Sequence, residues 1–135
     1  MTRKRKFVKT ACSVLVLAAA AAWPVAALAD EHSEIANAAT HAGLAAQAAD
    51  ISGVHTHLHH TLNCLVGPKG VGFDAKELNP CANDGNGAIP DATDAASKTE
   101  LEAAADKART GIAATDLATA KKVATDTETA LKTIK

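Results

Sequence analysis

The chain has 135 residues, a hydrophobic fraction of 47% that is mostly alanine, and an aromatic fraction of only 2%. Its net charge is −1 with neutral histidines, so it lacks the basic excess with which proteins contact nucleic-acid phosphates. Alanine favours helix but buries little apolar area. This composition predicts a helical domain with a thin core, in which a haem pocket would be hard to build.

Residues 1–29 have the three parts of a secretory signal peptide. A basic head precedes an apolar run from Ala11 to about Ala22, and Ala27-Leu28-Ala29 ends the segment with a small-x-small cleavage pattern. The run is shorter and richer in alanine than a membrane anchor, so we expect no membrane span after cleavage, which follows either Ala29 or Ala27. Cleavage after Ala29 removes five basic residues and no acidic residue, which changes the net charge from −1 to −6. This predicts a periplasmic or secreted protein without a nucleic-acid partner.

Residues 31–66 have a helical composition with one apolar seam. The seam consists of Leu44, Ile51, Leu58 and Leu65. A seven-residue spacing places these side chains on one face of a helix that packs against a partner helix. Gly43 weakens the run because glycine is a poor helix former. The zone is therefore either one long helix or two helices separated by a break near Gly43.

Four of the six histidines lie between residues 55 and 60. His55 and His59 are four residues apart and share one helix face, an arrangement in which two imidazoles commonly bind one metal ion. We predict these two as the main ligands of a divalent transition metal, because copper, zinc and nickel all accept imidazole nitrogen. The weaker candidate ligands are His41, His57, His60 and His32.

The helical angles of the weaker candidates differ from one another. His41 has the same angle as His59 but lies about three to four turns away, so it joins the pair only if the chain folds back at Gly43. His57 lies on the opposite shoulder of the helix, and His60 is predicted to point outward.

The new N-terminus offers a second metal site. If cleavage follows Ala29, Asp30-Glu31-His32 begins the mature chain, and its amine, two amide nitrogens and imidazole can form a planar chelate for copper(II) or nickel(II). Cleavage after Ala27 would abolish this chelate.

The sequence offers no signal for haem attachment or catalysis. The chain has no C-x-x-C-H motif for covalent haem. No catalytic triad and no third firm zinc ligand is identified, so we expect no enzymatic activity.

Residues 67–97 are rich in Gly, Pro, Asn and Asp, which predicts an irregular loop. Cys64 and Cys81 remain as an even pair in an exported chain and predict a disulfide that closes the first part of this loop. Phe73 and Leu78 are expected to hold the loop against the helices. A loop of this length is usually functional or disordered, so residues 67–91 could also contact a protein partner.

Residues 98–134 form a second helical zone. Ser97-Lys98-Thr99-Glu100 has the pattern of a capping box, and Gly43-Leu44-Ala45-Ala46 is similar to Gly111-Ile112-Ala113-Ala114. If this similarity reflects a repeat, residues 30–135 form two helical hairpins in a four-helix bundle. Otherwise they form two long antiparallel helices. Both alternatives are all-α: a small antiparallel helical bundle with one disulfide-closed irregular loop.

The signal peptide and the segment His41–His60 resemble the small periplasmic, alanine-rich, histidine-bearing proteins that include the small metal-binding proteins of ammonia-oxidising bacteria. The resemblance implies an all-α fold and loose binding of several divalent metals, copper among them. This chain differs in having no histidine in its last helical zone and in its disulfide-closed loop. We therefore expect an exported metal-binding protein for buffering, sequestration or delivery. The alternative is a non-catalytic interaction module that uses the Gly-rich loop, with incidental histidines.

Overall fold

The computed structural model describes residues 30–135, and the predicted signal peptide lies outside them. Within this range the chain is all-helical, as expected, and contains no strand. The helices are α1 (Glu31–Gln47), α2 (Ile51–Val66), α3 (Ala88–Asp91), α4 (Ala95–Ala113) and α5 (Leu117–Thr133). Across the same residues, no helix is both long and apolar enough to cross a membrane.

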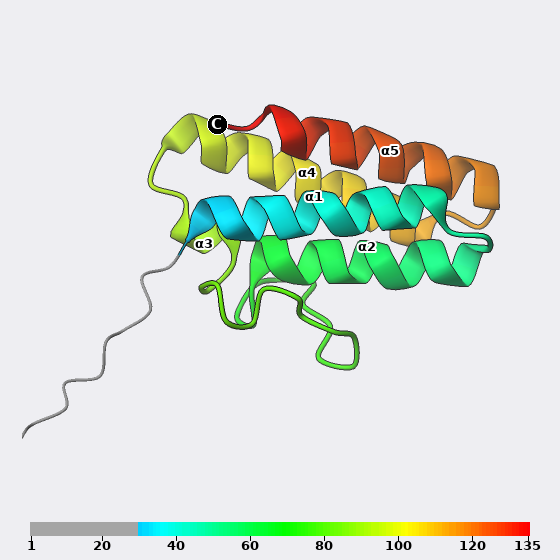
Figure 1. The fold of residues 1–135 in the computed structure, drawn as a ribbon, viewed down its shortest axis with the longest axis horizontal. Coiled ribbons are helices and arrows are strands. Elements are labelled where there is room, and N and C mark those ends of the chain that lie inside the picture. The colour runs from blue at the N-terminus through cyan, green and yellow to red at the C-terminus, as the bar shows by residue number, and fades with distance from the viewer. Residues whose placement is uncertain (1–29) are drawn as a thin grey trace, which may run out of the picture.

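The four long helices form two hairpins that pack into a bundle (Figure 1). Residues 48–50 join α1 to α2, and residues 114–116 join α4 to α5. In the bundle, α1 and α4 both pack against α2 and α5, and α2 and α5 also contact each other. The short α3 contacts α1, α2 and α4. Of the two expected architectures, the chain therefore adopts the pair of helical hairpins.

The two hairpin turns are set by aspartate caps. The carboxylate of Asp50 accepts a hydrogen bond from the Gly53 amide at 2.8 Å, and that of Asp116 accepts one from the Thr119 amide at 2.9 Å. Each side chain satisfies an amide that the first turn of its helix leaves unpaired. The helices therefore restart at these two aspartates.

The zone 31–66 is two helices, but the break is at residues 48–50 and not near Gly43, which lies inside α1, as Gly111 lies inside α4. A Cβ on Gly43 would lie 2.9 Å from the Glu128 carboxylate of α5, and one on Gly111 would lie 2.5 Å from a methyl group of Leu58 in α2. The two glycines therefore let neighbouring helices and their side chains approach closely, and neither ends a helix.

Alanine supplies much of the core. Its buried members are Ala38, Ala39, Ala42, Ala45, Ala88, Ala104, Ala105, Ala108, Ala120 and Ala124, packed with Ile35, Val54, Leu58, Leu62, Leu65, Val66, Leu101, Leu131 and the two cysteines. Leu58 and Leu65 of the predicted seam are fully buried, whereas Leu44 is 42% exposed. The seam assumed one continuous helix, and the chain reverses between Leu44 and Ile51. The heptad register is therefore lost at the turn.

The loop after α2 is closed by the predicted disulfide. Cys64 and Cys81 are bonded, with their Cα atoms 5.2 Å apart, and both are buried. Phe73 packs against the core, but Leu78 is 61% exposed, so the expectation that its side chain anchors the loop is wrong. The loop instead uses the backbone of this residue, whose carbonyl accepts a hydrogen bond from Asn63 at 3.1 Å.

The second half of the loop is more regular than predicted. It contains α3, and α4 begins at Ala95, three residues before the expected start of the helical zone. The N-cap is Asp94, whose carboxylate accepts a hydrogen bond from the amide of Ser97 at 2.8 Å. The capping-box pattern therefore placed the start of the helix about one turn too far along the chain, since Ser97 already lies inside α4.

Candidate metal centre

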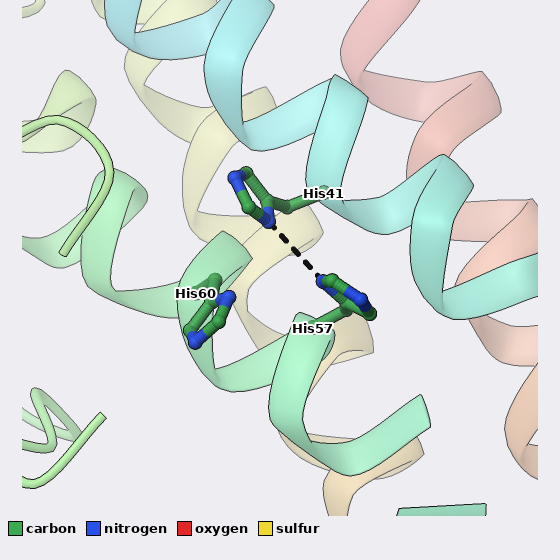
Figure 2. Close-up of side chains that lie close together, drawn as sticks. All are labelled: His41, His57 and His60. Carbon is green, nitrogen blue, oxygen red and sulfur yellow. Dashed lines mark hydrogen bonds between the residues drawn. The ribbon is translucent and has the colours of Figure 1, made fainter. Parts of the chain in front are cut away.

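Three histidines meet at the interface between the first two helices. His41 comes from α1, whereas His57 and His60 come from α2 (Figure 2). Residues three apart in a helix lie on the same side, so the two α2 rings face α1 together. His41 faces them because α1 and α2 run antiparallel on either side of the turn at residues 48–50.

The three rings offer one nitrogen each within a small volume. These ligand atoms all lie within 4.8 Å of one another, and the Nδ1 atoms of His41 and His57 are 3.3 Å apart. Two nitrogens bound to a tetrahedral zinc ion, each about 2.0–2.1 Å from the metal, are separated by roughly 3.3–3.4 Å. The first pair is therefore already at ligand spacing.

Burial favours the neutral form of two of the three rings. The pKa of His41 is lowered to about 4, first by burial and then by its neighbours His60 and His57. The pKa of His60 is also lowered, mainly by burial and by His57, against an opposing effect from Glu77. Both imidazoles are therefore neutral at pH 7 and keep a lone pair free for a metal, because protons compete for the same nitrogen.

His60 lies deeper than predicted. Its residue is only 8% exposed, so the expectation that it points outward is wrong. The helical angle of His60 describes α2 as an isolated helix, whereas in the fold α1 and the loop cover this side of α2. Its Nδ1 atom is buried without a hydrogen-bond partner, and its Nε2 atom lies 3.5 Å from a carboxylate oxygen of Glu77.

His55 and His59, the predicted main ligands, do not join this cluster. The Nε2 atom of His55 lies 3.0 Å from the carbonyl oxygen of Ala114, at the turn between α4 and α5. The Nδ1 atom of His59 is buried and has no hydrogen-bond partner. In residues 30–135, the cluster of His41, His57 and His60 is the one group of three or more potential ligands close enough to share an ion.

His32 stands apart from the cluster, in the first turn of α1. Its amide donates to the carboxylate of Asp30 at 3.1 Å, and the Asp30 amide donates to the carbonyl of Asp84 at 2.9 Å. The predicted N-terminal chelate needs the His32 amide nitrogen as a ligand. It therefore competes with the cap that begins α1.

Sequence reasoning missed Glu77, which contacts the cluster from the loop. Its position in the ring closed by Cys64 and Cys81 was the available signal, because that ring returns the loop to the helix that carries the histidines. The side-chain direction depends on the path of the loop, which periodicity does not give.

Comparison of the chain with protein-family models, with curated proteins and with solved structures finds no match in any of the three.

Proposed function

We propose that this chain is an exported protein that binds a divalent transition metal through His41, His57 and His60, for buffering, sequestration or delivery in the periplasm. One observation carries the proposal: two antiparallel helices bring three imidazole nitrogens within 4.8 Å of one another. The disulfide between Cys64 and Cys81 supports export to an oxidising compartment.

The donor set favours copper(II), zinc or nickel. Imidazole nitrogen suits these ions, whereas magnesium and calcium prefer oxygen ligands. Both cysteines are bonded to each other, so no thiolate from this pair is available for copper(I). Three protein ligands leave a fourth position for water or for a group from an acceptor molecule. Such a site suits an ion that is taken up and passed on.

The cluster is prepared for an ion before the ion arrives. The two Nδ1 atoms of His41 and His57 lie 3.3 Å apart, close enough for one ring to donate an Nδ1–H to the other. For an ion to replace that contact with two coordinate bonds, the donor ring must carry its proton on Nε2 instead of Nδ1, and neither ring has to move far. Because the ligands lie on two helices, an ion would also cross-link α1 to α2 and stabilise the fold.

Isothermal titration of the mature chain with copper(II), zinc and nickel tests the proposal. We expect one ion per chain, bound with micromolar or tighter affinity, and loss of that binding in His41→Ala/His57→Ala. The matched control is His55→Ala/His59→Ala, which also removes two histidines from the same hairpin and should leave the affinity within about threefold. Wild-type chain that binds none of the three ions, or equal losses in both double variants, would contradict the proposal.

The exposed loop supports a second candidate function. Val71 is 87% exposed and Leu78 is 61% exposed, and both lie in the segment closed by the disulfide. Exposed apolar side chains on an ordered loop favour contact with a protein partner. In that case replacing both residues by serine should abolish function and leave metal affinity unchanged.

A further inference from the structure

The segment around Glu77 is fixed to the helix that carries the histidines. Asn63 is fully buried on α2, and its amide group donates to the carbonyls of Asp74 at 3.0 Å and Leu78 at 3.1 Å. Its side-chain oxygen accepts the Asp74 amide at 2.9 Å. The next residue along α2, Cys64, is bonded to Cys81. Two adjacent residues of α2 therefore hold the loop on both sides of Glu77.

This attachment brings Glu77 against His60. A carboxylate oxygen of Glu77 lies 3.5 Å from Nε2 of His60, with the two side chains 32% and 10% exposed. That separation exceeds the usual N–H···O hydrogen-bond distance of about 2.7–3.2 Å, so the two groups form a polar contact in which the carboxylate faces Nε2. His60 lies one helical turn before Asn63, so the contact and the attachment of the loop share one face of α2.

A carboxylate at Nε2 determines which ring nitrogen of His60 carries the proton. An ionised carboxylate only accepts hydrogen bonds, so a neutral His60 places its proton on Nε2 to face Glu77. The lone pair is then on Nδ1, which is buried and has no hydrogen-bond partner in the structure. A carboxylate that orients a metal-binding histidine in this way is a recurrent element of metal sites and raises the basicity of the ligand.

We propose that Glu77 is a positioning residue of the metal centre, which holds His60 as the Nε2–H tautomer and directs its Nδ1 lone pair towards the ion. The inference rests on the proposed metal-binding function. It gives the disulfide-closed loop a role at that same site. The loop supplies no ligand, but it delivers the carboxylate that fixes the third ligand.

The metal-free protein provides the first test. Nitrogen-15 shifts of the imidazole rings, recorded at one neutral pH, should show His60 as the Nε2–H tautomer in wild type. Glu77→Gln keeps an oxygen that accepts this proton, so the tautomer should persist. Glu77→Ala should change the tautomer or give a mixture of the two. A wild-type Nδ1–H tautomer, or no change in Glu77→Ala, would overturn the inference whether or not the protein binds metal.

Metal affinity provides the second test. Loss of an orienting partner typically weakens metal binding by about 10–100-fold, so Glu77→Ala should raise the zinc dissociation constant by this factor and alter the visible spectrum of the cobalt(II) form. Glu77→Gln should lose less affinity and keep the wild-type spectrum. Glu100→Gln, which removes the same charge from an exposed position of α4, is the control and should match wild type.

The outcomes separate this inference from the proposed function. Wild type that fails to bind zinc or cobalt defeats the metal function, whereas normal wild-type binding with unchanged affinity and spectrum in Glu77→Ala defeats the positioning role alone. An equal loss in Glu100→Gln would assign the effect to net charge and also overturn it. Melting curves of the metal-free variants show whether Glu77→Ala is folded. If it is not, the test uses Glu77→Gln, which preserves the side-chain shape. A changed cobalt(II) spectrum or a changed His60 tautomer in that variant would overturn the positioning role.

Discussion

The Nδ1 atoms of His41 and His57 lie 3.3 Å apart although 16 positions separate the two residues in the sequence. Ala49, at the centre of the turn between α1 and α2, is eight residues from each of them. An antiparallel hairpin brings together residues equally distant from its turn. The position of one three-residue turn therefore creates the contact on which the proposed metal site depends.

The first prediction concerns stabilisation by the ion. Zinc at about 100 times its dissociation constant should stabilise the folded chain by about 2.7 kcal/mol, which raises the melting temperature by roughly 10 °C in a domain of this size. His41→Ala should abolish the increase, because it removes the ligand that α1 contributes. Differential scanning calorimetry with and without zinc measures the effect. His55→Ala should keep it, and an equal increase in both variants would contradict the site.

The second prediction concerns the disulfide. The Cys64–Cys81 bond closes a segment with a sequence separation of 17 residues, and a loop of this size contributes roughly 3 kcal/mol through the entropy of the unfolded chain. Cys64→Ser/Cys81→Ser, or reduction of wild type, should therefore lower the melting temperature by several degrees or more. An unchanged melting curve under reductant would show that the disulfide does not stabilise the folded chain.

The third prediction concerns pH and Glu34, which is fully buried on α1. One carboxylate oxygen accepts the Gly87 amide at 2.7 Å, and the other has no hydrogen-bond partner. Burial, with smaller effects from Asp91 and Asp84, raises the pKa of Glu34 from 4.5 to about 7. A raised carboxyl pKa means that the folded state binds the proton more tightly than the unfolded state. The contribution of this residue to the free energy of unfolding is therefore highest below about pH 4.5 and falls as pH rises to about 7.

Glu34→Gln isolates this effect, because glutamine stays neutral and still accepts the Gly87 amide. We expect the variant to become more stable relative to wild type as pH rises from about 4.5 to 7, by an amount on the order of 3 kcal/mol. Urea unfolding of both proteins at each pH measures the difference. The lowered pKa values of His41 and His60 are present in both proteins, so their opposing contribution to the pH dependence cancels. A difference that does not vary with pH would contradict the raised pKa.

The fourth prediction compares the same substitution at two helical glycines. Gly111→Ala should destabilise the chain by about 1–3 kcal/mol, because its Cβ would lie 2.5 Å from a methyl group of the buried Leu58 and 3.2 Å from Val123. Gly43→Ala meets only the end of the flexible Glu128 side chain, which can move. There the higher helix propensity of alanine should make the change neutral or stabilising by up to about 1 kcal/mol. Equal losses in both variants would contradict this difference.

The all-α class and the disulfide were predictable because they depend on local composition and on a single pair of cysteines. The position of the first turn was not, because Gly43 was the obvious helix breaker, whereas the side chain of Asp50 begins α2 through its bond to the Gly53 amide. A capping aspartate is a weaker signal than a glycine, but here it decides where the helix begins.

The position of the turn also explains why the structure groups His41 with His57, and not with the predicted main ligands His55 and His59. A turn centred on Gly43 places His41 opposite residue 45, whereas the turn at residues 48–50 places it opposite His57. For the contact between Glu77 and His60, the sequence offered only the position of Glu77 in the disulfide-closed loop, which does not give the direction of its side chain. That direction requires the path of an irregular loop, which here is fixed by the long-range hydrogen bonds of Asn63.

The hairpin that carries the histidines is secured at both ends. At one end three residues connect α1 to α2; near the other, the sulfur of Cys81 lies 3.7 Å from the carbonyl oxygen of Glu34. The turn and the disulfide-closed loop thus bracket the histidines along the hairpin, so the frame of the proposed site is assembled without an ion. Exchange of an ion would then depend on rotation of individual rings and not on separation of the helices. A carrier built this way could load and unload without ever opening its fold.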